Sequence, residues 1–279
     1  MARVIVALDF DKTLTQNDTI SRIVSFIKAK HPKHADFGPI DKSYYDALSH
    51  HQALWQPQLH QSPLTKQLIA QYLGSFRDLE EKSLARTNQS GILAGVTRQE
   101  LWEAGRSVAF QKDAAKAINE LVDNGSYRVC VVSVNWTKDY IKGALQANGV
   151  VEWQSVDVYC NDFEFDEDTG LSTGVVQPRM VVAQDKVDAI ARICEHEGAE
   201  CRVVYVGDST TDFLALLDAD VGLLVGDNTA VLEWCDRLGV PLGKPRAVDG
   251  CTKTLHCLEH WADLGLLVRR LDDKVGGWQ

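Results

Sequence analysis

The chain has 279 residues, of which 45% are hydrophobic and 24% charged, and this composition excludes a disordered or low-complexity protein. A chain of this length is expected to form one large domain, or a core domain with a smaller companion. Its 29 basic and 39 acidic residues give a formal net charge of −10. Nucleic acid and anionic membranes are therefore not expected partners, and an anionic ligand must be held by local groups.

We expect neither a membrane span nor a secretion signal in this chain. No apolar run reaches the roughly 20 residues that cross a membrane. The first residues, MARVIVALD, reach an aspartate without a small-residue cleavage site. Seven cysteines occur, an odd number without a C-x-x-C pair, and we expect free, buried thiols of a protein in the reducing cytoplasm. They are Cys130, Cys160, Cys194, Cys201, Cys235, Cys251 and Cys257.

Short apolar runs alternate with helical patterns over much of the chain. Continuous β-branched runs predict strands that are covered on both faces, at 4–8, 128–134, 202–206 and 221–225. Apolar residues at helical spacing predict helices at 112–123, 137–147 and 186–197. This alternation predicts an α/β fold with a doubly wound, Rossmann-like parallel sheet, in which ligands bind beyond the carboxyl ends of the strands. Asp9, Ser133 and Asp208 all lie at such ends.

Residues 17–107 interrupt this alternation. They contain helical patterns at 19–30, 66–76 and 98–105, four of the seven prolines and no convincing buried strand. We therefore expect a mainly helical inserted domain at 17–107, with a core domain formed by 1–16 and 108–279. Asp18 is a candidate N-cap for the first helix of the insertion. Further along, 162–174 predicts a hairpin with its turn around 168–170.

Five acidic or basic residues near the predicted strand ends carry the chemistry. Asp9 and Asp11 follow the first strand, so one carboxylate can attack phosphorus while the other handles the proton of the leaving group. Lys186 supplies a positive charge at the start of a helix, and Asp208 and Asp212 follow another strand. Four carboxylates beside one lysine would repel one another without a divalent cation, and oxygen ligands of this kind favour Mg²⁺.

The motifs together resemble the haloacid dehalogenase superfamily of phosphohydrolases. The matching segments are DFDKTLT, VVSVN, Lys186 and GDSTTD, in the expected order, and the resemblance covers residues 1–16 and about 108–230. The insertion directly after the first motif is similar to that of the branch with a helical cap between motifs one and two, to which phosphoserine phosphatase belongs. The inserted domain is accordingly expected to be such a cap.

The resemblance implies a role for each matching residue. Asp9 would be the nucleophile that forms an aspartyl-phosphate, and Asp11 would protonate the leaving oxygen and then activate water. Ser133, whose strand-end position also offers backbone N–H groups to an anion, would bind the phosphoryl group. Lys186 would hold that group against Asp9. Asn135 is a further candidate phosphate contact, with a role in the turn as the alternative.

The resemblance also implies Mg²⁺ as the cofactor. The expected metal ligands are Asp9, Asp11, Asp208 and Asp212. Of these, Asp11 would use its backbone carbonyl, and Asp212 would hold the metal's waters or orient Lys186. Phosphoserine phosphatases usually carry asparagine immediately before the last aspartate, where this chain has Thr211, which argues against transferring their amino-acid phosphate specificity.

These observations predict a Mg²⁺-dependent phosphomonoester hydrolase that acts on a small phosphorylated metabolite through an aspartyl-phosphate. A phosphomutase or phosphotransferase, a prenyl-phosphate-acting enzyme of the same fold and a non-catalytic binding protein remain alternatives; Asp11 argues against a dehalogenase. The basic cluster at 28–34 is expected to be a solvated helix end. Trp55 and Tyr72 are candidate specificity residues of the cap, although packing within the cap is the simpler interpretation.

Overall fold

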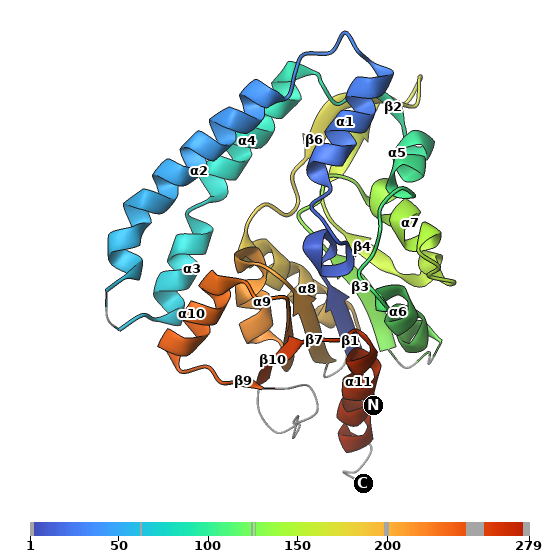
Figure 1. Ribbon diagram of the computed structural model, residues 1–279. Coiled ribbons are helices and arrows are strands. Elements are labelled where there is room, and N and C mark those ends of the chain that lie inside the picture. The colour runs from blue at the N-terminus through green and yellow to red at the C-terminus, as the bar shows by residue number, and fades with distance from the viewer. Residues whose placement is uncertain are drawn as a thin grey trace.

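A parallel sheet of seven strands lies at the centre of the computed structural model, which describes residues 3–61, 63–123, 125, 127–197, 201–243 and 254–275. Within this described part the strand order is β4-β3-β1-β7-β8-β10-β9 (Figure 1). The strands are β1 (Arg3–Leu8), β3 (Tyr127–Val132), β4 (Asp157–Tyr159), β7 (Cys201–Gly207), β8 (Val221–Val225), β9 (Leu242–Gly243) and β10 (Thr254–Leu258). Because β1 pairs in parallel with both β3 and β7, the carboxyl ends of these three strands are neighbours.

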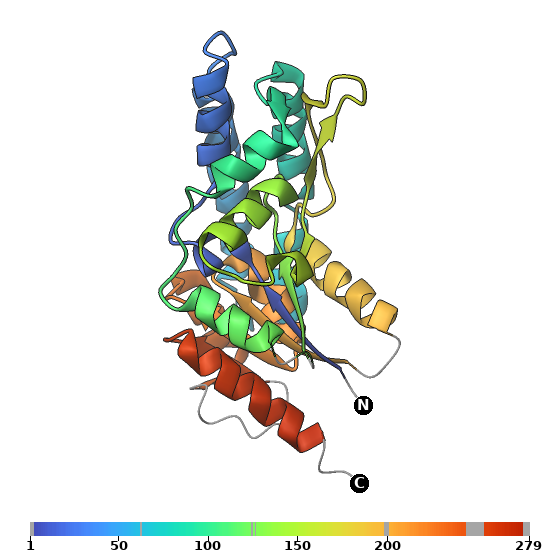
Figure 2. The same cartoon turned by 90° about the vertical axis from the view of Figure 1, so that its right-hand side faces the viewer.

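Helices cover both faces of the sheet, as Figure 2 shows. Alternate residues of β1 face opposite sides: Val4 and Val6 belong to one hydrophobic cluster, and Ile5 and Ala7 to the other. The first cluster is closed by α6 (Ala114–Val122), α7 (Lys138–Ala147) and α11 (Ala262–Val275). The second is closed by α8 (Ala183–Glu197), α9 (Phe213–Asp218) and α10 (Thr229–Leu238). The predicted doubly wound α/β fold is thereby confirmed, with its four predicted strands as β1, β3, β7 and β8.

The insertion after β1 is mainly helical, as predicted. It contains α1 (Ile20–Lys30), α2 (Gly38–Leu59), α3 (Lys66–Gly74), α4 (Arg77–Ser90) and α5 (Arg98–Gly105). It also holds one short strand that the sequence did not predict, β2 (Ala94–Thr97), between α4 and α5. This strand has only four residues, of which Val96 alone is buried, so it lacks the continuous apolar run that marks a core strand.

The unexpected strand β2 belongs to a second, antiparallel sheet in the order β2-β6-β5. Its other strands are β5 (Asp162–Phe165) and β6 (Leu171–Gln177), which form the predicted hairpin. The hairpin turn closes through the Asp166 N–H, which donates to the Leu171 carbonyl at 2.9 Å. The insertion is thus tied to a hairpin that comes more than sixty residues later in the chain.

Two glycines allow α5, the last helix of the insertion, to pack closely against α7 of the core. At Gly143 in α7 a Cβ atom would lie 1.9 Å from the Trp102 carbonyl oxygen of α5, and at Gly105 it would lie 2.0 Å from the Tyr140 carbonyl oxygen. Only glycine therefore permits this approach of the two helix backbones. Since α7 begins a few residues after Ser133, this contact also positions the loop that follows β3.

The structure bears on two further expectations. Among the helices that it describes, none is both long and apolar enough to cross a membrane. Six cysteines are free thiols, as predicted, and half of them are buried. Cys251 lies outside the described residues.

Substitution of Gly143 by alanine is expected to destabilise the protein. The added methyl group forces α5 and α7 apart, which should lower the free energy of unfolding by about 2–3 kcal/mol. Gly74→Ala at the end of α3 is the matched control, because nothing lies within 4 Å of its Cβ position. It should leave the stability unchanged or raise it by up to about 1 kcal/mol. Urea unfolding of both variants tests the contact, and equal stabilities would contradict it.

Candidate active site

Three carboxylates meet where β1 and β7 end. Asp9 follows β1, and Asp208 and Asp212 follow β7. One carboxylate oxygen from each lies within 4.8 Å of those of the other two. The neighbouring positions of β1 and β7 in the sheet produce this convergence, in keeping with the binding of ligands beyond the carboxyl ends of parallel strands.

The turn after β1 positions the side chain of Asp9 in this cluster. The Asp9 N–H donates to the Val206 carbonyl of β7 at 2.9 Å, which continues the pairing of the strands by one residue. Lys12 then adopts a left-handed conformation with φ of 59°, uncommon for a residue with a side chain and typical of a tightly constrained turn. The hydroxyl of Thr13 donates to Asp208 Oδ1 at 2.9 Å and lies 3.4 Å from Asp9 Oδ2. Thr13 thus joins two of the carboxylates, a role that the sequence analysis missed.

Lys186 is fully buried among the carboxylates. Its ammonium group donates to Asp9 Oδ1 at 2.7 Å and to Asp212 Oδ1 at 2.6 Å. A buried ammonium group is tolerated only when it is paired and hydrogen-bonded, and both conditions are met here. The sequence-based placement of Lys186 beside Asp9 agrees with this geometry.

Asp212 is held almost entirely by protein donors. The hydroxyl of buried Tyr205 donates to Oδ1 at 2.7 Å. The Asp208 N–H, the Ser209 N–H and the Ser209 hydroxyl all donate to Oδ2, at 3.1, 3.0 and 2.7 Å. Gly207 allows this close turn, since a Cβ there would lie 2.5 Å from Asp212 Cγ. Both carboxylate oxygens of Asp212 therefore accept hydrogen bonds from protein groups. Asp212 is better placed to orient Lys186 than to bind a metal directly.

The electrostatics of the cluster show an excess of negative charge. Burial, followed by the charge of Asp212, raises the pKa of Asp9 well above its usual value, against the opposing effect of Lys186. Burial also raises the pKa of Asp208 to about 6. For Asp212, Lys186 and the hydrogen bonds of its neighbours outweigh burial and lower the pKa. A hard divalent cation would relieve this excess, and Asp9 and Asp208 offer it carboxylate oxygens.

Asp11 lies in the same crevice but has different partners. Its Oδ1 accepts hydrogen bonds from the Thr19 N–H at 2.8 Å and the Thr19 hydroxyl at 2.6 Å. Its Oδ2 accepts one from the amide of Asn135 at 2.9 Å. Burial raises the pKa of Asp11 to about 6, while these hydrogen bonds act in the opposite direction. The carboxylate of Asp11 does not belong to the cluster of three carboxylates.

Ser133 and Asn135 are both fully buried at the end of β3. The Ser133 hydroxyl oxygen accepts from the Asn135 N–H at 3.1 Å, and its own hydrogen has no acceptor among the described residues. The amide nitrogen of Asn135 donates to Asp11 and also to the Thr19 hydroxyl at 2.9 Å. Asn135 therefore holds Asp11 in place, whereas Ser133 retains a free donor.

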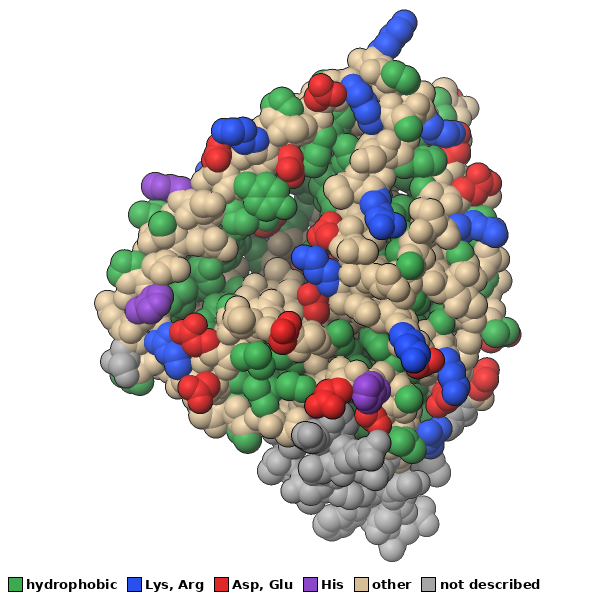
Figure 3. Space-filling view, in the orientation of Figure 1, with side chains coloured by type: hydrophobic (Ala, Val, Ile, Leu, Met, Phe, Trp, Pro, Cys, Tyr) green, Lys and Arg blue, Asp and Glu red, His purple; other side chains and the backbone are tan. Residues whose placement is uncertain are grey.

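The space-filling view shows a hollow between the arm formed by α2 and α4 and the part formed by α1, with hydrophobic and acidic side chains around it (Figure 3). Trp136, directly after Asn135, packs edge-on against Phe37 with ring centroids 6.4 Å apart. The Tyr44 hydroxyl of α2 donates to Glu80 of α4 at 2.9 Å. No motif in the sequence marks either of these two contacts, each of which joins segments that are distant in the chain.

Trp55 and Tyr72 lie elsewhere. Their ring centroids are 5.7 Å apart, and Tyr72, which is 8% exposed, also packs against Phe76 and Trp234. This aromatic cluster joins α2 and α3 to α10 of the core. Aromatic packing accounts for both residues, but it is only partly packing within the insertion, because Tyr72 also contacts Trp234 of α10.

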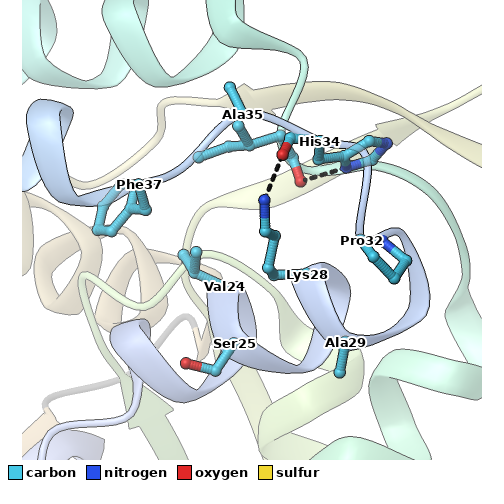
Figure 4. A pocket seen from close by; sticks show the side chains of 9 residues that line it. Val24, Ser25, Lys28, Ala29, Pro32, His34, Ala35 and Phe37 are labelled. Atoms are coloured by element: carbon cyan, nitrogen blue, oxygen red, sulfur yellow. Dashed lines mark hydrogen bonds between the residues drawn. The ribbon is translucent and has the colours of Figure 1, made fainter.

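The basic cluster at 28–34 lies at the C-terminal end of α1, as expected, where Lys30 and Lys33 are exposed and Lys28 and His34 have partners within the insertion. Lys28 donates to the His34 carbonyl and pairs with Asp36 at 3.1 Å, and His34 bonds the Ile92 carbonyl at 3.0 Å. A cavity of about 520 Å³ opens beside these residues and is lined by Val24 and Phe37 among others (Figure 4). The cluster thus braces the end of α1, and none of its basic residues bonds a catalytic candidate.

The parallel α/β core with carboxylates at its strand ends is the arrangement of a hydrolase of the haloacid dehalogenase type. Residues 6–217 match the haloacid dehalogenase-like hydrolase family, and the chain belongs to it. Among solved structures, a phosphoserine phosphatase with a phospho-aspartyl intermediate analogue has a TM-score of 0.51 at 19% identity, over 84% of this chain and 91% of that one. A cytosolic 5'-nucleotidase IIIB bound to cytidine has a TM-score of 0.58 at 12% identity, over 98% of this chain and 88% of that one. These likenesses show a shared fold.

Curated relatives are more similar in sequence. The mitochondrial bifunctional TH2 protein of Arabidopsis thaliana is 26% identical over 220 residues, 70% of this chain and 35% of that protein, so the chain spans about a third of its length. A CTO1 family protein of Schizosaccharomyces pombe is 29% identical over 82% of this chain and 84% of its own. Cold tolerance protein 1 of Saccharomyces cerevisiae is 24% identical over 77% of this chain and 76% of that protein.

Removal of the buried ammonium group is expected to destabilise the fold strongly. Lys186→Met leaves Asp9 and Asp212 without their common counter-charge, which should lower the free energy of unfolding by about 3–5 kcal/mol at neutral pH. The measurement is urea unfolding in the presence of a chelator. Exposed Lys12 gives the control, and Lys12→Met should change the stability by less than about 0.5 kcal/mol. A loss below about 1 kcal/mol for Lys186→Met would contradict the assigned pairing.

Proposed function

We propose that the chain is a phosphomonoester hydrolase in which Asp9 is the nucleophile. This proposal rests on the different contacts of the two oxygens of the Asp9 carboxylate. Oδ1 accepts the 2.7 Å hydrogen bond from Lys186, whereas Oδ2 has only the 3.4 Å contact with Thr13. A buried carboxylate with one oxygen held and the other available is suited to attack on phosphorus.

The donors around Asp9 are suited to a phosphoryl group. The ammonium group of Lys186 has three hydrogens, of which Asp9 and Asp212 take two, so the third can donate to a phosphoryl oxygen. The free hydroxyl hydrogen of Ser133 supplies a second donor from the end of β3. These fixed donors stabilise the charge that phosphoryl transfer distributes over the equatorial oxygens.

In the proposed reaction Asp11 transfers the proton. Asp9 Oδ2 forms a bond to phosphorus while the bond from phosphorus to the leaving oxygen breaks, and Asp11 gives its proton to that oxygen. Water then attacks the aspartyl-phosphate and gives a proton to Asp11, which releases phosphate and restores the Asp9 carboxylate. Hydrogen bonds from Thr19 and Asn135 hold the Asp11 carboxyl in one orientation through both steps.

The donor set suits Mg²⁺ as the cofactor. Asp9 and Asp208 would hold it with carboxylate oxygens and Asp11 with its backbone carbonyl, while Asp212 would act through Lys186 and through the turn at Asp208. When bound, Mg²⁺ supplies positive charge that offsets the crowded carboxylates and the phosphate.

Family membership supports the hydrolase class, and the carboxylate cluster supports the chemistry. We further propose that residues 17–107 act as a cap on the core formed by 1–16 and 108–279, and that the partner is a small-molecule phosphate ester, not nucleic acid or a membrane. The free cysteines are typical of a reducing compartment, and we propose the cytoplasm.

Replacement of the nucleophile is expected to abolish turnover. Asp9→Asn retains the shape of the side chain but lacks the anionic oxygen, so phosphate release from a panel of phosphate esters should fall by at least about 10³-fold. Asp188→Asn, an exposed aspartate of α8, is the matched control and should retain wild-type activity. Activity of Asp9→Asn within tenfold of the wild type would exclude Asp9 as the nucleophile.

The metal proposal has a readout that needs no turnover. Mg²⁺ added to chelator-treated protein should raise the melting temperature, because it binds only the folded arrangement of Asp9 and Asp208. In Asp208→Asn this rise should be largely lost. Differential scanning calorimetry with and without Mg²⁺ measures both effects, and an equal rise in wild type and variant would exclude Asp208 as a ligand.

A further inference from the structure

Resting on the proposed function, in which Lys186 donates to the phosphoryl group, we propose that Arg77 is a positioning residue for Lys186. Arg77 is the first residue of α4 in the helical insertion, and Asp185 directly precedes Lys186 in α8. Through its ion pair with Asp185, Arg77 fixes the start of α8 and thereby the ammonium group of Lys186.

This ion pair joins segments that lie 108 positions apart in the chain. Arg77 Nη2 donates to Asp185 Oδ1 at 2.5 Å, and Arg77 Nη1 lies 3.6 Å from Glu81 Oε1, one turn further along α4. The Asp185 side chain is only 13% exposed. Burial acts to raise the pKa of Asp185, but hydrogen bonds from the Val181 N–H and from Arg77 outweigh it and lower the pKa. A largely buried, ionised acceptor makes this contact firmer than a pair at the open surface.

The second oxygen of Asp185 holds the turn that begins α8. Oδ2 accepts hydrogen bonds from the Val181 N–H at 2.8 Å and from the Val182 N–H at 3.0 Å, both just before the first helical residue. A carboxylate that reaches back in this way satisfies free N–H groups at a helix start and favours the helix dipole. Because Lys186 is the next residue, the same turn sets the point from which its side chain leaves the helix. One carboxyl group thus links α4 to the base of Lys186.

The ammonium group of Lys186 has little tolerance for displacement. Its hydrogen bonds to Asp9 and Asp212 are 2.7 and 2.6 Å long, and its side chain is fully buried. The third hydrogen is the one assigned above to a phosphoryl oxygen. A shift of the start of α8 would lengthen one of these contacts, and fixed donors in phosphoryl transfer lose their effect over distances below 1 Å.

The same part of the insertion also leads to Asp212, the partner of Lys186. Four aromatic rings pack in succession, with centroids 4.9, 6.0 and 5.2 Å apart: Phe76, Tyr72, Trp234 and Phe213. Arg77 follows the first of these residues in the chain, and Asp212 precedes the last. The junction of α3 and α4 therefore reaches the chain neighbours of both members of the buried ion pair, at Asp185 directly and at Phe213 through Trp234.

The chain offers a matched control in the ion pair of Arg202 and Asp220. Arg202 is 48% exposed and Arg77 is 44% exposed, and the Arg202–Asp220 distance is 2.8 Å. Asp220, like Asp185, also accepts from a backbone N–H, that of Val203 at 2.8 Å. Arg202 lies at the amino end of β7, whereas the catalytic aspartates follow carboxyl ends of strands.

The first test measures turnover of 4-nitrophenyl phosphate with Mg²⁺, at a temperature where circular dichroism shows every variant folded. Arg77→Gln should lower kcat by about tenfold, and Arg77→Lys, which keeps the charge, should recover part of that loss. Arg202→Gln should leave kcat as in the wild type. A kcat of Arg77→Gln within twofold of the wild type would overturn the inference.

A double variant tests whether Arg77 acts through Asp185. If it does, Arg77→Gln combined with Asp185→Asn should lose no more activity than the more damaging of the two single variants. Losses that multiply would show that the two residues act independently, which would overturn the assigned route to Lys186.

A spectroscopic readout separates this inference from the proposed function, because it needs no turnover. The ammonium hydrogens of a buried, hydrogen-bonded lysine exchange slowly with water, so Lys186 should give its own signal in ¹H–¹⁵N spectra of the labelled protein, assigned through its side-chain carbons. Arg77→Gln should shift or broaden this signal, and Arg202→Gln should not. A moved signal in a protein without phosphatase activity would contradict the proposed function and still support the positioning role. A wild-type spectrum without the signal, or a signal that Arg77→Gln leaves unchanged, would overturn that role.

Discussion

The buried ammonium group of Lys186 is the interaction on which the catalytic arrangement depends. It lies between Asp9 and Asp212 with short hydrogen bonds to both, although like-charged carboxylates would otherwise repel each other in the buried crevice. Since Lys186 comes from α8 and the two aspartates follow different strands, its position fixes three elements of the core relative to one another. The same pairing engages Asp9 Oδ1 and leaves Oδ2 with the 3.4 Å contact from Thr13.

Besides the pair of Arg77 and Asp185, the proposed cap contacts this arrangement at two separate places. At the first, Thr19 precedes α1 and donates both its N–H and its hydroxyl to Asp11, so a displacement of α1 would move the partners of the proposed general acid. At the second, Tyr72 of α3 packs against Trp234 of α10, which in turn packs against Phe213, the residue after Asp212. The helical insertion thus contacts residues next to Asp11 and next to Asp212.

The sequence predicted those parts of the molecule that have strong local signals. Strands such as β1 and β8 are continuous apolar runs, and Asp9 and Asp208 follow strands in short acidic motifs. The long helix α2 was missed because none of its 22 residues is buried and because it contains two prolines. Pro39 lies in the first turn, where a helix tolerates proline, but Pro57 lies inside the helix. Weak amphipathicity and two apparent helix breakers conceal such a helix.

Site residues that were missed depend on contacts between distant segments. Thr13 stands within the first motif, yet its hydrogen bond to Asp208 spans 195 positions of the chain. Tyr205 reads as a core residue of a strand, and only the structure shows its hydroxyl on Asp212. For Asn135 the structure shows an amide that is committed to Asp11, which sequence spacing could not distinguish from a phosphate contact.

The central claim is that Asp9 attacks phosphorus and forms a covalent intermediate. Its most direct test is the stereochemical course of hydrolysis of an ester made chiral at phosphorus with oxygen isotopes or sulfur. Transfer to Asp9 and then to water involves two in-line displacements, each of which inverts phosphorus, so the account predicts overall retention of configuration. Overall inversion would show a single direct attack by water and would contradict it.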